Sequence, residues 1–240
     1  MGAAARTRAL VFGGTGTVGE AVVRGLREAG VATVFGWHRA RERAAALAAE
    51  LDARPLELDL ADAGATRAAL RALRDGGFNP DVFIHCAAVA PAAPLAAISD
   101  EDWRQATEVS GHAAVIALQE LAPAMAAAGE GHVVLVGALD RAQSLPLPIA
   151  FAAAQGALGA ITMAAAKELG PQGIRVNLVA LGLLEGGLSG QLAPSLSKDY
   201  TTFSALHRLG QPQEAARAIL WLALENTYVS GKILSVNGGI

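Results

Sequence analysis

The segment Gly13-Gly14-Thr15-Gly16-Thr17-Val18-Gly19 decides the fold class of this 240-residue chain. An apolar run, Arg8–Phe12, precedes it, and an amphipathic helical pattern, Val18–Ala29, follows it. Glycine suits this junction because it permits a tight turn, lets the backbone approach a pyrophosphate, and allows a helix to pack closely on a strand. The N–H groups at the start of the helix then face an anion. The segment predicts a dinucleotide-binding type of fold, and a glycine-rich turn that binds nothing is the alternative.

Six further apolar runs alternate with longer helical patterns. They are apolar at successive positions, as strands buried on both faces require, and this favours a parallel sheet covered by helices. We therefore expect an α/β fold: one doubly wound domain over residues 1–240, with a seven-stranded parallel sheet and helices on both faces. Segments Pro91–Pro94, Leu145–Pro148 and Leu181–Pro194 each follow a strand and should form the ligand crevice. The seven runs are Arg8–Phe12, Ala32–Phe35, Pro55–Leu58, Val82–Cys86, His132–Val136, Arg175–Val179 and Lys232–Val236.

Composition excludes several classes of protein. The 19 basic and 22 acidic residues give a formal net charge of −3 and are spread along the chain, so we expect no nucleic-acid binding. Cys86 is the only cysteine and no His/Cys cluster has metal-ligand spacing, so neither an internal disulfide nor a metal site is expected. The apolar stretches Val82–Ile98 and Val109–Ala128 are interrupted by prolines and a glutamate, and no signal-peptide core is present. A soluble cytoplasmic protein is the prediction.

Four later motifs extend the pattern over nearly the whole chain, and together they resemble the short-chain dehydrogenase/reductase superfamily. The resemblance is strongest to the 3-oxoacyl-thioester (acyl-carrier-protein or CoA) reductases. It implies a Rossmann fold and hydride transfer between a nicotinamide cofactor and a carbonyl or alcohol. The motifs are Asp59-Leu60, Asp81-Val-Phe-Ile-His-Cys-Ala-Ala88, Gly173-Ile-Arg-Val-Asn177, and the C-terminal pair Arg208-Leu-Gly-Gln-Pro-Gln-Glu214 and Tyr228-Val-Ser-Gly-Lys-Ile-Leu-Ser-Val-Asn-Gly-Gly239.

The same resemblance identifies four positions where the family carries its catalytic tetrad, and all four differ here. The tyrosine position is Phe151, the lysine position is Gln155, and the serine position is Ala138. The asparagine that holds a water in the proton relay aligns with Ser110. The pKa of a free phenol is about 10, and the phenol needs a neighbouring cation to act at neutral pH. Because Gln155 carries no charge, even a tyrosine restored at position 151 would lack this cation. We expect no catalytic residues of the usual kind.

Cofactor binding is expected to be absent or weak. The resemblance assigns Gly13, Gly16 and Gly19 to the phosphates and Asp59 to the adenine side. Arg39 follows the second strand, where no acidic residue is present to accept a ribose 2′-OH, so it is a candidate for a 2′-phosphate and hence for NADP(H). A solvated arginine is the alternative.

The nicotinamide pocket also departs from the family pattern. Gly186 stands for a threonine that holds the carboxamide, and Thr17 stands for a glycine of the turn. His85 and Cys86, at the end of a strand expected to face the crevice, could supply a replacement acid or nucleophile, as could Asp140. We favour a buried pair and a loop residue, because no third group that would orient His85 is visible.

The pattern Phe151–Leu169 is apolar on almost every side of a helix, which indicates contact with a second chain. In the family this helix packs on its counterpart across a dimer, and Val229–Ile240 resembles the second contact of the tetramer. The favoured hypothesis is a catalytically silent subunit that pairs with an active paralogue, as a heterotetramer, in an oxidoreductase acting on hydroxyacyl or oxoacyl thioesters. The alternatives are an NADP(H)-dependent reductase or dehydratase with a relocated acid/base, and a non-catalytic nucleotide sensor.

Overall fold

The computed structural model describes residues 7–138 and 147–240, and within them seven strands alternate with helices. The strands are β1 Arg8–Phe12, β2 Ala32–Trp37, β3 Arg54–Glu57, β4 Val82–His85, β5 Gly131–Gly137, β6 Ile174–Leu181 and β7 Ile233–Val236. The helices are α1 Thr17–Glu28, α2 Arg41–Leu51, α3 Ala63–Asp75, α4 Asp100–Thr107, α5 Ala113–Ala128, α6 Ile149–Leu169, α7 Pro194–Phe203 and α8 Pro212–Leu220. A π-helical turn, Glu108–His112, joins α4 to α5.

All seven strands pair in parallel in the order β3-β2-β1-β4-β5-β6-β7, so the predicted fold class is confirmed. Strands β2 and β3 extend the sheet on one side of β1, and strands β4 to β7 extend it on the other side, so the strand order reverses between β3 and β4. In an open parallel sheet, a ligand crevice lies outside the carboxyl ends of the strands at this reversal. The glycine-rich turn follows β1 and the segment Cys86–Ala88 follows β4, so both lie at that point.

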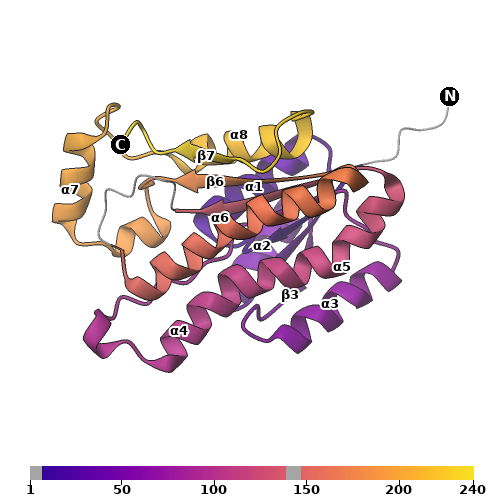
Figure 1. Cartoon of the computed structure of the whole chain (residues 1–240), viewed down its shortest axis with the longest axis horizontal. Helices are drawn as coiled ribbons and strands as arrows, with labels where there is room; N and C mark the ends of the chain where they lie inside the picture. The colour runs from indigo at the N-terminus through magenta and orange to yellow at the C-terminus, as the bar shows by residue number, and fades with distance from the viewer. Residues whose placement is uncertain (1–6, 139–146) are drawn as a thin grey trace.

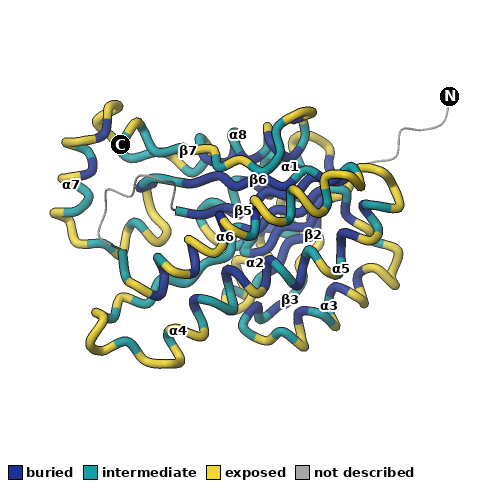
Figure 2. Tube along the Cα trace, viewed as in Figure 1, coloured by how far each residue is buried: buried dark blue, intermediate teal, exposed yellow. Residues whose placement is uncertain are grey.

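Two hydrophobic cores lie on opposite faces of the sheet. In Figure 1, α3, α4, α5 and α6 lie in front of the strands, whereas α1, α2 and α8 lie behind them. Along β1, Leu10 and Phe12 belong to the front core, and Ala9 and Val11 belong to the back core. This alternation explains why the central strands β4 and β5 are buried at every position, whereas the edge strands β3 and β7 are largely exposed and do not match the expected burial on both faces. Figure 2 shows the consequence, a buried sheet inside helices whose outer sides are exposed.

Helix α6 has two distinct faces. Its inner face packs on β5 and β6 and includes Phe151, Leu158 and the buried hydroxyl of Thr162. Its outer face is apolar yet exposed; its exposed residues include Ala153, Gly156, Ala157, Ala160, Met163 and Ala164. By length and composition, the segment Ile149–Gln172 could cross a membrane, and its inner face packs on β5 and β6. A soluble, cytoplasmic protein stays a prediction.

Candidate functional site

A cavity of about 480 Å³ opens at the carboxyl edge of the sheet. The turn after β1, the ends of β4, β5 and β6, the start of α6 and the segment 182–192 form its walls. The cavity brings together Ala138, Phe151 and Gln155, three of the four positions that the sequence assigned to the tetrad. Ser110 does not line it and is completely buried in the π-helical turn.

The glycines of the first turn are required by packing. A Cβ on Gly13, whose φ is +74°, would lie 2.8 Å from the Cα of Ala87. A Cβ on Gly19 would lie 2.0 Å from the carbonyl oxygen of Gly13, and one on Gly14 would lie 2.6 Å from the Cβ of Phe35. Since no side chain caps α1, the first N–H groups of this helix keep their capacity to bind an anion. The turn therefore has the geometry of a phosphate-binding loop.

The adenosine end of the crevice contains His38, Arg39 and Asp59. The Nε2 atom of His38 lies 3.7 Å from Oδ2 of Asp59, whose Oδ1 accepts a hydrogen bond from the N–H of Ala61 at 3.0 Å. Arg39 is exposed and has no ion pair within the described part of the chain, whereas nearby Arg43 is paired with Glu20 at 2.7 Å.

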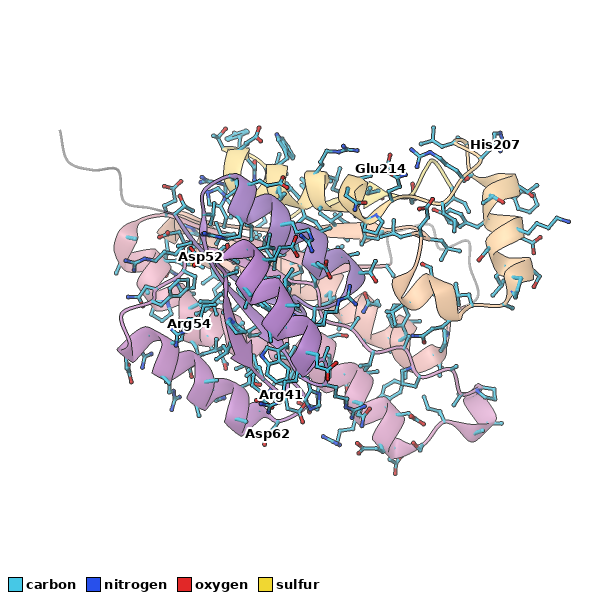
Figure 3. All side chains as sticks on the ribbon, turned by 180° about the vertical axis from the view of Figure 1, so that it is seen from behind. Arg41, Asp52, Arg54, Asp62, His207 and Glu214 are labelled. Atoms are coloured by element: carbon cyan, nitrogen blue, oxygen red, sulfur yellow. The ribbon has the colours of Figure 1, made fainter. Side chains whose placement is uncertain are left out.

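The orientation of α2 and α3 places this end at the crevice. In Figure 3, Arg41 at the start of α2 lies near Asp62, which caps α3, and away from Asp52 and Arg54 at the far end of α2. The segment after β2 therefore faces the edge where the strands end. His38, Arg39 and Asp59 do not line the main cavity.

The chemical end of the crevice is almost free of charge. Phe151 is 6% exposed and presents a hydrocarbon ring. Gln155 is 2% exposed; its Oε1 accepts a hydrogen bond from the N–H of Ala138 at 3.0 Å, and its Nε2 has no partner among the described residues. Arg43, already held by Glu20, is the one charged side chain among the described residues that line the cavity. These side chains can hold an uncharged group but supply no activated proton donor.

Tyr200 is a cavity residue that the sequence analysis missed. Its ring is buried, its hydroxyl donates to the carbonyl oxygen of Asn237, and burial raises the pKa of its phenol. No motif pointed to Tyr200, because α7 brings it to the cavity from a segment without a family signature. A raised pKa and an engaged proton make this phenol a packing group rather than an acid.

The expected position of His85 at the crevice was wrong, but the favoured interpretation of His85 as a buried residue is confirmed. Side chains alternate along a strand, so His85 points with Phe83 into the front core, where it is completely buried. Its Nε2–H donates to the carbonyl oxygen of Ser110 at 3.0 Å, and burial lowers the pKa of its imidazole to about 4. Cys86 does line the cavity, but burial raises the pKa of its thiol to about 12. Asp140 lies outside the described residues.

A nicotinamide dinucleotide, which the fold implies, fits one part of this crevice and not another. The glycines of the turn suit its phosphates. The nicotinamide end offers Phe151 and Gln155 instead of a hydroxyl and a cation. Above the turn, a Cβ added to Gly187 would lie 2.9 Å from Oγ1 of Thr17, so the two walls of the crevice come close together there. Within the described residues, no cluster of three metal-binding side chains is found.

Comparisons with known proteins agree with this architecture. A family model described as enoyl-(acyl carrier protein) reductase matches residues 14–240. The L-2,3-butanediol dehydrogenase of Corynebacterium glutamicum is 30% identical over 178 residues, which cover 69% of this chain and 68% of that protein. The 3-oxoacyl-[acyl-carrier-protein] reductase FabG of Staphylococcus aureus is 24% identical over 238 residues, which cover 97% of each protein.

Solved structures show the same similarity. A short chain dehydrogenase/reductase family protein superposes with a TM-score of 0.86 at 26% identity, covering 97% of this chain and 96% of that one. A blue fluorescent protein from a metagenomic library, in complex with NADPH, has a TM-score of 0.85 at 28% identity, covering 97% of each chain. With its parallel seven-stranded sheet, its glycine-rich turn and a family match over most of its length, this chain belongs to the short-chain dehydrogenase/reductase superfamily of oxidoreductases, close to the 3-oxoacyl-acyl-carrier-protein reductases.

Proposed function

We propose that this chain is a non-catalytic subunit that assembles with a catalytically intact paralogue. The complex would be an oxidoreductase acting on hydroxyacyl or oxoacyl thioesters. The observation that carries the proposal is the pair Phe151 and Gln155 on the cavity wall, where the family resemblance assigns the proton donor and its activating cation.

The chemical argument concerns the proton. Reduction of a carbonyl needs a proton for the new alkoxide, and general acid catalysis contributes roughly 10²–10⁴-fold to such a step. Phe151 has no proton to give, and Gln155 has no charge to lower the pKa of a neighbour. The phenol of Tyr200 and the thiol of Cys86 both have pKa values raised by burial, and His85 is outside the cavity. These three groups offer no replacement.

The partner argument concerns the outer face of α6. Met163 on this face is 49% exposed, and Ile149 at its start is 41% exposed. Trp103 on the adjacent α4, which packs on α6, is 44% exposed. Small residues between these side chains would allow another helix to approach closely, and burial of apolar area favours association at about 25 cal/mol per Å² before association costs.

The choice of a paralogue over a second copy rests on function. A homo-oligomer would contain no working site, whereas a mixed tetramer keeps the sites of its partner. The second contact would use the C-terminal segment Val229–Ile240, where Leu234 is 38% exposed; Tyr228, which directly precedes this segment, is 98% exposed. The thioester class is carried over from the FabG relatives.

Co-expression with a paralogue that keeps an intact Ser, Tyr and Lys set tests the proposal. We expect a stoichiometric complex on size exclusion, a tetramer with two of each chain, and a rise in the solubility or activity of the partner. Gly156→Leu, which places a large side chain on the outer face of α6, should abolish the complex, whereas Glu42→Gln on the distant α2 should leave it intact. A stable homotetramer that ignores every paralogue would contradict the proposal.

The isolated chain should not oxidise NADPH or NADH in the presence of 3-oxoacyl thioesters or simple ketones. Turnover by the purified wild-type protein that disappears in an Asp140→Asn variant would favour the relocated acid/base instead. Saturable nucleotide binding without turnover and without any partner would favour the sensor.

A further inference from the structure

Thr17 and the glycine pair Gly186–Gly187 meet across the crevice. A Cβ built on Gly187 would lie 2.9 Å from Oγ1 and 3.1 Å from Cβ of Thr17, and one built on Gly186 would lie 3.9 Å from its Cγ2. The two glycines have φ values of +77° and +58°, a conformation that other residues rarely adopt. The backbone after β6 therefore passes close to the side chain of Thr17, the first residue of α1.

The segment that makes this contact is fixed by its own hydrogen bonds. The N–H of Leu184 donates to Oγ of Ser189 at 3.1 Å, and the N–H of Glu185 donates to the carbonyl oxygen of Gly210 at 2.8 Å. The N–H of Gly190 closes a turn on the carbonyl oxygen of Gly186 at 3.3 Å. Bonds on both sides of the glycine pair thus hold it in place over Thr17.

The contact lies where a dinucleotide would have to pass. In a Rossmann turn, a glycine lets the backbone come close to the pyrophosphate that joins the two nucleosides. Thr17 occupies such a position, at the start of α1 between the adenosine end and the cavity that contains Phe151. A passage this narrow leaves too little room between Thr17 and the glycine pair for phosphate oxygens.

We propose that Thr17, acting with Gly186–Gly187, sets the nucleotide specificity of this chain by excluding the pyrophosphate of a dinucleotide. The consequence is weak or absent NADP(H) binding even though the glycine-rich turn is intact. Because the exclusion depends on Cβ and Oγ1 of one side chain, removing that side chain should open the passage. This inference concerns the crevice alone and does not depend on the partner subunit.

The test is titration of the purified full-length chain with NADPH, followed by nucleotide fluorescence and by calorimetry. Thr17→Gly should bind NADPH at least about tenfold more tightly than the wild type. Removal of the steric overlap between the Thr17 side chain and the pyrophosphate should lower the dissociation constant by about this factor. Thr17→Ser keeps Cβ and Oγ1 and should bind like the wild type. Thr15→Gly, a matched change in the same turn, should also leave the affinity unchanged.

Folding and ligand controls complete the experiment. Circular dichroism and thermal unfolding should show that Thr17→Gly is folded, because glycine in the first helical turn has a small cost. Adenosine 2′,5′-bisphosphate, which has no pyrophosphate, should bind the wild type and Thr17→Gly equally. Equal NADPH affinities for the wild type and folded Thr17→Gly, including no binding by either, would overturn the proposal. The proposal would also be overturned if Thr17→Gly raised the affinity for adenosine 2′,5′-bisphosphate as much as the affinity for NADPH.

Discussion

The phosphate end and the chemical end of the crevice are built on the same sheet, but they differ in how tightly their residues are packed. At the phosphate end, Gly13, Gly14 and Gly19 are enclosed so tightly that a methyl group on any of them would overlap neighbouring atoms. At the chemical end, Phe151 and Ala138 line the cavity, so an atom added on the cavity side has free space to occupy. The glycines of the phosphate turn are therefore required for packing of the fold, whether or not a ligand binds. Its presence says more about architecture than about activity.

The largest effect that separates the two ends should come from Gly19→Ala. The new Cβ would meet the Gly13 carbonyl oxygen at 2.0 Å, so the turn or α1 must shift. We expect the free energy of unfolding to fall by about 3 kcal/mol, the upper part of the range for overpacking. Urea denaturation measures this. A loss below about 0.5 kcal/mol would show that the turn is not fixed by packing, and would remove the contrast between the two ends.

Acid should have the next largest effect, through His85 beneath the crevice. The ordinary imidazole pKa is 6.5 and that of folded His85 is about 4, so the unfolded chain binds the extra proton between these values. Stability from this group is complete above pH 6.5 and is lost as the pH falls towards 4, by about 3 kcal/mol in total. His132, whose pKa burial also lowers, adds in the same direction.

Chemical denaturation at a series of pH values between 4 and 7 tests this assignment. His85→Gln keeps a donor for the Ser110 carbonyl oxygen and should flatten the dependence on pH. His207→Gln, a change of an exposed histidine, should leave the profile of the wild type. An unchanged slope in His85→Gln would mean that another group is responsible for acid sensitivity.

A smaller effect of opposite sign is expected for Gly156→Ala on the outer face of α6. No atom lies within 4 Å of the new Cβ, and alanine stabilises a helix interior by about 0.5–1 kcal/mol relative to glycine. Thermal unfolding of the isolated chain should show the gain. Comparison with Gly19→Ala distinguishes a glycine that packing requires, Gly19, from one that packing does not require, Gly156. A loss of stability would indicate that the outer face is already covered in the isolated protein.

The smallest effect should be that of Phe151→Tyr at the chemical end. The added hydroxyl can project into the cavity, so we expect stability to change by less than about 0.5 kcal/mol. NADPH oxidation should stay undetectable, because Gln155 provides no cation to lower the pKa of the phenol. Turnover gained by this single change would mean that the site lacks only one group, and the non-catalytic proposal would fail.

Much of the fold could be predicted from local patterns. Each of the seven strands lies within about two residues of an apolar run. The central strands β1, β4 and β5 are buried on both faces and so have a continuous apolar signal, whereas the edge strands β3 and β7 are largely exposed. The start of α6 was misplaced by two residues, since the helix begins at Ile149 directly after Pro148. The site was predicted less completely. His85 was assigned to the crevice although strand alternation turns it into the core, and Tyr200 was missed because it comes from a distant helix.

The sequence by itself determined the parallel seven-stranded sheet, the glycine-rich turn after β1 and the residues at the four positions that the family resemblance assigns to the tetrad. Those properties follow from hydrophobic pattern, from the conformational freedom of glycine and from residue identity, which are all local. Only the tertiary structure decided that Oε1 of Gln155 accepts a hydrogen bond from the Ala138 N–H, and that His85 is buried with its Nε2–H donating to the Ser110 carbonyl oxygen. It also decided that Gly187 lies close to Thr17. These are contacts between segments far apart in the chain, and their geometry depends on how the helices pack on the sheet.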